Sequence, residues 1–400
     1  MRGQIRPNSL HPMAHDPSQL LIGNYARRDL TMDRGEGVYL WDTDGKRYLD
    51  LFAGFGGGVL GHCHPDLVRA ATEQAGKLWH VGNTFHTEPQ NKVAAHLKEK
   101  AFDGRAFYCH GGMDANEAAV KLARRRGSEK GRYKTVCFNM SFHGRSLAMI
   151  AAGSTEAHRA GFGPDVPGFV RATGGDIDDL AKHVDDETCA IMFEPLRGEG
   201  GMVGYPDDFP AKVRQLCDDK GLSLIFDEVW TGGGRTGQWF GHQWFQGGVK
   251  PDLMTLGKAV GGGLPVGILW AEPEHANHLV PGTHGSTLGG NPICMAVCDA
   301  VFTVIERDGL LAHARDLGEH AKAKLKDALP DADVRGNGLF LGIELPSEPS
   351  GDLVGLGLER GVSINLPQKK VVRLAPPMTI TKQQWDEGLD LTISAIRDAK

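Results

Sequence analysis

The residues with the clearest chemical potential are a lysine among glycines and an acidic pair upstream of it. Lys258 lies within residues 251–267, where an apolar run gives way to a glycine-rich stretch. The apolar run 222–226 ends in Asp227 and Glu228. A lysine amine can form a Schiff base with an aldehyde, and a nearby carboxylate can hold a proton on a heterocyclic nitrogen. The coenzyme pyridoxal 5′-phosphate (PLP) requires this pair of groups.

These residues also have an ordinary structural interpretation. A lone lysine is normally solvated, and a carboxylate at the end of a strand often caps a helix or binds a neighbouring side chain. Lys258 differs because apolar residues and glycines surround it, and burial lowers the pKa of an amine. Glu228 doubles the acid beside Asp227 at an otherwise apolar strand end. We therefore favour a chemical role for Lys258 and Asp227.

The rest of a coenzyme site could come from the ends of other apolar runs. The turn 110–114 contains two glycines and precedes the helix-forming segment 115–125, so its amides could bind a phosphate. A plain strand-to-helix turn explains the same residues. Phe142 could cover one face of a pyridine ring and Val229 the other, although a core phenylalanine is equally common.

Two arginines and a pair of histidines are further candidates for ligand binding. Arg145 and Arg373 adjoin apolar runs or glycine-rich loops, and each could bind a carboxylate through two hydrogen bonds. His62 and His64 are of the type that binds metals, but their close spacing suits a turn and no further cluster completes a site. We therefore expect no metal.

The elements that must position these residues are strands alternating with helices. Apolar, β-branched or aromatic runs occur at residues 105–109, 135–138, 190–193 and 222–226, and in a run that ends near residue 256. This alternation predicts an α/β fold with a mostly parallel central sheet covered by helices. Ligands bind at the carboxyl ends of the strands in such sheets, and the candidate residues follow these ends.

The length of the chain predicts two domains, because 400 residues exceed one typical hydrophobic core. We expect a large coenzyme-binding domain at residues 66–300. A smaller α+β domain would combine residues 1–65 with residues 301–400. Its strands would include a hairpin at 38–50, with its turn at Asp44 and Gly45, and later strands at 340–344 and 371–374.

Composition narrows the classes of function. The formal net charge of -6 gives no electrostatic reason to expect nucleic acid as a partner. No apolar stretch approaches the ~20 residues that span a bilayer. Residues 1–20 lack the apolar stretch of a signal peptide. The seven cysteines are scattered and odd in number, so we expect a reduced, cytoplasmic setting without a membrane anchor.

Long, ordered motifs add a family resemblance to this picture. They lie at residues 34–42, 60–65, 115–124, 141–145, 194–201, 227–229, 234–237, 255–258 and 284–292. With them, the chain from about Tyr25 to Arg373 resembles the class III aminotransferases of PLP fold type I. The likeness is greatest to the acetylornithine and ornithine branch of that family.

The resemblance implies a role for each coenzyme-binding residue. Lys258 would carry PLP and move the proton between substrate and coenzyme, and Asp227 would pair with the ring nitrogen. Phe142 and Val229 would cover the two faces of the ring. The residues thereby assigned to the coenzyme are Gly112, Met113, Phe142, Asp227, Glu228, Val229, Trp230, Lys258 and Thr287. Gly112 and Met113 would hold the phosphate through their amides. Thr287 would reach it from a neighbouring subunit, which implies a homodimer with shared active sites.

The resemblance also assigns the substrate-binding residues. Arg145 would bind the α-carboxylate of the amine donor, with Ser286 nearby. Glu199 would cover Arg373 while the donor is bound and would then release it to bind 2-oxoglutarate. Tyr25 would stand at the mouth of the pocket.

Three features depart from the family pattern. The phosphate loop usually reads Asn-Ser-Gly-Thr/Ala-Glu, whereas residues 110–114 read His-Gly-Gly-Met-Asp. Trp230 replaces a glutamine that usually contacts the ring oxygen of the coenzyme; its indole N–H could donate instead, but its bulk alters the pocket. Gly56 to Gly58 replace bulkier residues near the substrate entrance. These differences bear on the choice of donor more than on the coenzyme chemistry.

The sequence thus predicts a PLP-dependent ω-aminotransferase that acts in two stages. N-acetylornithine would give up its amino group, which 2-oxoglutarate would then take, as in arginine biosynthesis. Ornithine, succinylornithine and 4-aminobutyrate remain alternative donors. An aminomutase or decarboxylase of the same fold, and a non-catalytic PLP-binding protein, are the other hypotheses.

Overall fold

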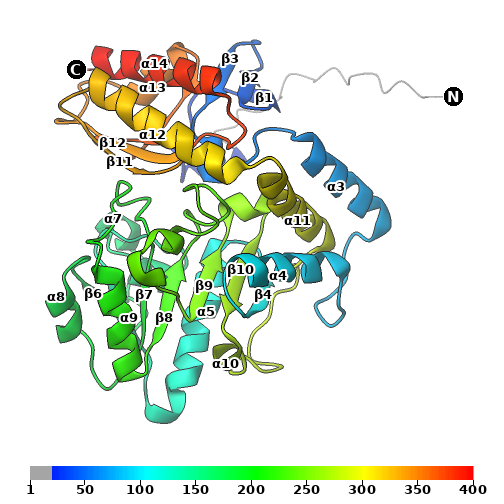
Figure 1. The fold of residues 1–400 in the computed structure, drawn as a ribbon, viewed down its shortest axis with the longest axis vertical. Coiled ribbons are helices and arrows are strands. Elements are labelled where there is room, and N and C mark those ends of the chain that lie inside the picture. Colours follow the sequence, from blue (N-terminus) through cyan, green and yellow to red (C-terminus); the bar gives the residue numbers. More distant parts are fainter. Residues whose placement is uncertain (1–19, 400) are drawn as a thin grey trace.

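The strands of this protein form three sheets within residues 20–399, the part that the computed structural model describes (Figure 1). Residues 1–19 and Lys400 lie outside the described part, so the expectation of no signal peptide falls almost wholly outside it.

The largest sheet has seven strands, and most of its neighbouring pairs are parallel. Its order is β4 (Arg105–Cys109), β10 (Gly267–Ala271), β9 (Leu253–Leu256), β8 (Ser223–Asp227), β7 (Thr188–Phe193), β5 (Lys134–Phe138) and β6 (Phe169–Ala172). Strand β10 runs antiparallel to both of its neighbours. The predicted α/β fold with a mostly parallel central sheet is therefore confirmed.

Helices cover both faces of this sheet, which explains why its central strands are apolar throughout. In β7, Ala190 and Met192 pack with α5 (Gly112–Gly127), whereas Ile191 and Phe193 pack with α9 (Phe209–Lys220). This alternation is the two-residue period of a strand. The other helices of the segment are α3 (Pro65–Lys77), α4 (Glu88–Lys100), α6 (Leu147–Ala152), α7 (Glu156–Arg159), α8 (Ile177–Lys182), α10 (Pro273–Ala276) and α11 (Pro292–Arg307).

A second sheet contains the predicted amino-terminal hairpin. Its strands are β1 (Met32–Glu36), β2 (Tyr39–Asp42), β3 (Arg47–Asp50) and β13 (Val362–Ser363), and the short helix α2 (Ala53–Gly56) follows β3. Gly45 has a φ of 80°, and the Asp42 carboxylate accepts hydrogen bonds from the amides of Asp44 and Lys46, so the turn is fixed locally. β3 pairs in parallel with β13, so distant parts of the chain share one sheet.

The third sheet is built from the carboxyl-terminal part of the chain. It contains β11 (Asp333–Asn337), β12 (Phe340–Glu344), β15 (Val371–Leu374) and β14 (Asn365–Gln368), accompanied by α12 (Leu310–Ala328), α13 (Leu353–Glu359) and α14 (Lys382–Asp398). One hydrophobic cluster joins Leu49 and Leu51 near the amino end to Leu341 and Trp385 near the carboxyl end. The two smaller sheets lie together above the large sheet in Figure 1. Domain boundaries at residues 65 and 300 stay a prediction.

Candidate active site

Two neighbouring strands of the large sheet bring Asp227 and Lys258 together at their carboxyl ends. β8 and β9 are parallel, with Asp227 at the end of β8 opposite Thr255, and Lys258 lies just beyond the end of β9. The φ of Lys258 is 44°, a left-handed backbone conformation that non-glycine residues adopt at an energetic cost. Gly257 before it is needed for close packing, because a Cβ there would lie 2.9 Å from the amide nitrogen of Gly112.

Both residues line a cavity of about 260 Å³. The volume is near the lower end of the range for small-molecule sites, which begins at about 300 Å³. The lining residues follow the carboxyl ends of successive strands, as expected for a parallel sheet. They are Gly112, Met113, Asn116, Phe142, His143, Gly144, Arg145, Glu194, Asp227, Val229, Trp230 and Lys258.

The Asp227 carboxylate is buried and held from three directions. Asn116 donates to it from α5 over 2.8 Å, the Val229 amide donates over 3.0 Å, and His143 Nδ1 lies 2.7 Å away. The side chain of Asp227 is only 3% exposed. A carboxylate fixed in this way can face a ligand in the cavity without rearranging.

His143 is the positive partner of Asp227. Burial alone lowers the pKa of His143, but its hydrogen bond and attraction to Asp227 outweigh that effect, so the pKa lies well above the usual value. The Asp227 carboxylate therefore stabilises the protonated form of the imidazole. The pair places a carboxylate, held by a buried imidazole, against the cavity.

The net shift of the pKa of Lys258 is in the opposite direction. Burial lowers the pKa of the amine from 10.5 to about 8, although the charge of Asp227 acts against the shift. A substantial fraction of the amine is neutral near that pH and can act as a nucleophile or a base. Its Nζ lies 4.2 Å from the centroid of the Trp230 ring.

The amino terminus of α5 offers backbone amides at the cavity. Gly111 precedes the helix, and no side chain caps it there. At Gly112 a Cβ would lie 2.5 Å from a methyl carbon of Val229, so only glycine allows this approach of helix and strand end. The amides of Gly112 and Met113 are thus close to the strand ends that carry Asp227 and Lys258.

A buried arginine from the third sheet completes the surroundings of the cavity. Arg373 is 1% exposed, and its guanidinium donates to the Glu199 carboxylate over 2.6 Å and to Asn365 over 2.7 Å. Arg145, at the cavity itself, has Nη2 at 3.0 Å from His158 Nε2. One guanidinium group therefore lines the cavity, and a second, beside Trp230, is covered by Glu199.

Six residues named from the sequence are not among those that line the cavity, and two of them, Glu199 and Arg373, form the ion pair beside it. The Glu228 carboxylate is buried on another side, where the amides of Gly241 and His242 donate to it over 2.7 and 2.8 Å. It therefore fixes a loop, and the structure corrects its assignment to the coenzyme. Tyr25 is 63% exposed, and Thr287 is also exposed. Ser286 lies 3.5 Å from His110 Nε2 in the turn before α5.

Three polar residues that line the cavity were not assigned a role from the sequence. Asn116 and His143 bind Asp227, and Glu194 accepts hydrogen bonds from the amides of Phe142 and Gly198 over 2.9 and 3.2 Å. All three lie inside motifs that were already singled out. The signal that could have identified them is a polar side chain at the end of an apolar strand or at the start of the following helix.

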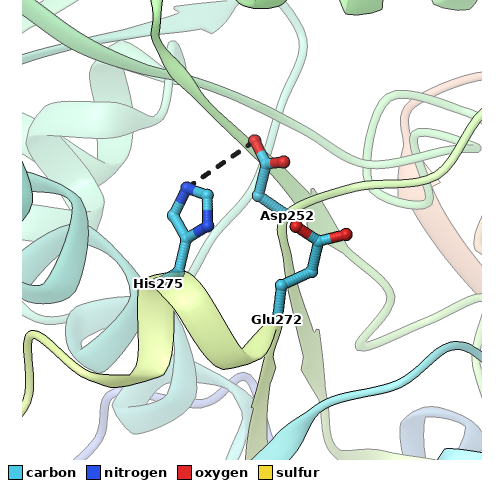
Figure 2. Close-up of side chains that lie close together, drawn as sticks. All are labelled: Asp252, Glu272 and His275. Atoms are coloured by element: carbon cyan, nitrogen blue, oxygen red, sulfur yellow. Dashed lines mark ion pairs between the residues drawn. The ribbon is translucent and has the colours of Figure 1, made fainter.

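A second group of acidic and histidine side chains lies at the other end of the central strands, where β8 and β9 begin (Figure 2). Asp252, Glu272 and His275 have ligand atoms within 4.8 Å of one another. Arg214 already pairs with Asp252 at 3.1 Å, and the Leu224 amide donates to Asp252 over 2.6 Å. The group ties the starts of β8 and β9 together, far from Lys258, and we assign it no part in the chemistry.

The comparison with known proteins decides the family. The model of the family described as aminotransferase class-III matches residues 23–396. The chain belongs to the class III aminotransferases. It is therefore a PLP-dependent transaminase, which confirms the family and enzyme class predicted from the sequence.

Individual relatives agree with this assignment. The acetylornithine aminotransferase of Agrobacterium fabrum is 42% identical over 92% of this chain and 94% of its own length. That of Aquifex aeolicus is 42% identical over 94% and 99%. Among solved structures, ornithine aminotransferase from Toxoplasma gondii has a TM-score of 0.90 with 29% identity over 95% of this chain and 92% of its own. N-acetylornithine aminotransferase from Stenotrophomonas maltophilia has a TM-score of 0.80 with 32% identity over 94% and 97%.

Among residues 20–399, no helix combines the length and the apolar character that crossing a membrane requires.

Proposed function

We propose that this aminotransferase moves the terminal amino group of N-acetylornithine to 2-oxoglutarate, as a cytoplasmic homodimer in arginine biosynthesis. The single observation that carries the proposal is the 2.6 Å pair of Glu199 and Arg373 near a cavity that also contains Arg145 and Lys258. Two guanidinium groups, one of them reversibly covered, suit an enzyme that must bind a monocarboxylate donor and a dicarboxylate acceptor in turn. The names of the relatives support the same donor.

The residues present fit PLP. Bound PLP supplies an aldehyde that takes the amino group and a ring that withdraws electrons from the reacting carbon. Lys258 would attach it, Asp227 would face the ring nitrogen, and the amides of Gly112 and Met113 would bind the phosphate. Phe142 and Val229, which line the cavity, would cover the ring. In the homodimer, Thr287 of the neighbouring subunit would add a contact to the phosphate.

Lys258 is also the group that moves the proton. With a pKa of about 8, its Nζ could take a proton from the carbon that bears the amino group of the donor and deliver it to the coenzyme. A surface lysine with an ordinary pKa would remain protonated at neutral pH and could not act as a base.

Arg145 and Arg373 divide the recognition of the two substrates. Arg145 would bind the α-carboxylate of N-acetylornithine, with Ser286 nearby and Tyr25 at the mouth of the pocket. Glu199 would neutralise Arg373 during that stage, because an unpaired buried guanidinium is costly. When Glu199 moves away, Arg373 can bind a carboxylate of 2-oxoglutarate.

Ornithine is the second candidate donor. The likeness to ornithine aminotransferase of Toxoplasma gondii, with a TM-score of 0.90, favours it over succinylornithine and 4-aminobutyrate. The presence of Arg145 together with the Glu199–Arg373 pair argues against an aminomutase or decarboxylase, which need not alternate between two such substrates.

A panel of amine donors at one fixed concentration of 2-oxoglutarate tests the proposal. The panel contains N-acetylornithine, ornithine, succinylornithine and 4-aminobutyrate, and the measurement is the release of glutamate. We expect the highest kcat/KM with N-acetylornithine. A higher value with another donor would replace the donor, and no glutamate from any donor would refute the proposed reaction.

The lowered pKa of Lys258 makes a separate prediction about coenzyme uptake. Only the neutral amine can attack the aldehyde, so the rate constant for uptake of PLP by the coenzyme-free protein should rise about tenfold per pH unit below the pKa. It should level off above a midpoint of about 8. The absorbance change after mixing protein and PLP at a series of pH values measures it. A midpoint near 10.5, the ordinary value, would show that the amine is not desolvated.

A further inference from the structure

We infer that Trp230 positions Arg373 for the acceptor and thereby helps to select a dicarboxylate as the second substrate. The inference rests on the proposed function, because it concerns the arginine assigned to 2-oxoglutarate. Trp230 stands where the family resemblance leads one to expect glutamine, so the feature belongs to this chain in particular.

The indole of Trp230 lies close to both the lysine of the site and the buried arginine. The centroid of its ring is 4.2 Å from Lys258 Nζ and 4.4 Å from the central guanidinium carbon of Arg373. Phe340 stacks on the indole with centroids 4.9 Å apart and an interplanar angle of 12°. A guanidinium at this distance over an indole is attracted to the π electrons of the ring.

The ring is held too tightly to turn aside. Trp230 is 3% exposed. A Cβ at Gly56 would come within 2.5 Å of ring atom Cζ3, and one at Gly198 within 2.8 Å of Cδ1. Glycine at both positions makes room for the indole, and the same contacts prevent it from moving. Trp230 is therefore a rigid platform for the side chain above it.

Glu199 and Arg373 differ in how freely their side chains can move. The Glu199 side chain is 28% exposed and can swing toward solvent, whereas Arg373 is 1% exposed and cannot. Once Glu199 moves, the guanidinium keeps Asn365 as a hydrogen-bond acceptor and the Trp230 ring as a π partner. The Nε–H of Arg373 has no acceptor among the described residues, so it can donate a hydrogen bond to a new one. The ring thus keeps the guanidinium in place for an incoming carboxylate.

This arrangement separates the two halves of the reaction. The donor is bound while Glu199 covers Arg373, so loss of the ring should affect its binding little. The acceptor needs the uncovered guanidinium in its correct position. Trp230 is therefore a positioning residue whose removal weakens binding of the acceptor more than binding of the donor.

The test compares Trp230→Leu with Trp230→Phe in the PLP-loaded enzyme. Donor and acceptor half-reactions are followed separately through the absorbance of the coenzyme. We expect Trp230→Leu to raise the KM for 2-oxoglutarate about tenfold, the range for a desolvated cation–π contact, and the donor KM less than about twofold. Trp230→Phe, which keeps an aromatic face, should restore most of the affinity for 2-oxoglutarate.

Trp239→Leu is a matched control. Trp239 also stacks on a phenylalanine, Phe302, at 5.5 Å, and it has Lys100 at 4.9 Å over its ring, outside the cavity. Its substitution should leave both KM values unchanged. Coenzyme content, measured by absorbance, shows in each variant whether the site is still loaded.

Three outcomes would overturn the inference. They are an unchanged KM for 2-oxoglutarate in Trp230→Leu, an equal rise of both KM values, and a Trp230→Phe variant no better than Trp230→Leu. Loss of the coenzyme from Trp230→Leu would also overturn it, because the ring would then serve the coenzyme. If instead the wild-type enzyme forms no glutamate from 2-oxoglutarate, the proposed function itself fails.

Discussion

Replacing Lys258 with alanine will lower the rate of the donor half-reaction by about 10⁴-fold or more, the upper range for a positioned proton-transfer group. The loss is large because one side chain is assigned two tasks, attachment of the coenzyme and movement of the proton. Its neighbours cannot replace it: Asp227 is already bound by Asn116 and His143.

The measurement combines kinetics with the covalent state of the coenzyme. Stopped-flow absorbance gives the half-reaction rate for purified Lys258→Ala. Mass spectrometry after borohydride reduction shows whether PLP has become covalently attached. We expect attachment to wild-type protein and none to the variant.

Lys100→Ala is the control for loss of a buried lysine. The Lys100 side chain is 3% exposed and pairs with Glu306 at 2.9 Å, outside the cavity. This variant should keep its covalent coenzyme and its rate. If Lys258→Ala retained both, the role proposed for Lys258 would be wrong.

Replacing Asp227 with asparagine should lower the same rate by about 10²–10³-fold, the cost of removing one preorganised charged group from an active site. Without the carboxylate, the group proposed to hold a proton on the ring nitrogen of the coenzyme would be missing. The amide also conflicts with its surroundings, because Asn116 and the Val229 amide both donate toward this side chain.

His143 provides a readout that is independent of turnover. Its pKa lies well above the usual value because of Asp227, while burial alone would lower it. In Asp227→Asn the pKa of His143 should fall below its value in the wild-type enzyme. NMR titration of the His143 ring measures this change.

Asp252→Asn is the matched control, because Asp252 also adjoins the central strands and accepts a backbone hydrogen bond, but at their other end. Its effect should be on stability and not on the rate of the folded enzyme. An unchanged rate in Asp227→Asn, with the pKa of His143 also unchanged, would contradict the assignment of Asp227.

Much of the fold was predictable because the central strands are short apolar runs separated by helical segments. The run 105–109 is β4, and the runs at 340–344 and 371–374 are β12 and β15. Strand β10 and its antiparallel direction were not predicted, because a short buried run looks the same in either direction. Strand β6, an edge strand of only four residues, was not predicted either.

Within the site, residues whose backbone position fixes their role were predicted better than those whose role depends on side-chain direction. Asp227 and Lys258 follow adjacent parallel strands, so their proximity follows from the topology. Glu228 is the next residue after Asp227, yet its side chain points to the loop at Gly241 and His242, as expected when successive side chains alternate along a strand. Adjacency to a functional residue was therefore a poor guide to its function.

The amino-acid sequence by itself determined the α/β architecture, the family and the lysine–aspartate pair. Each of these follows from local patterns, namely apolar runs, glycine positions and short motifs. Only the folded chain decided how the pair is supported. His143 meets Asp227 across 84 positions, Asn116 across 111, and Arg373 meets Glu199 across 174. Contacts between such distant residues depend on which strands become neighbours and which way each side chain turns.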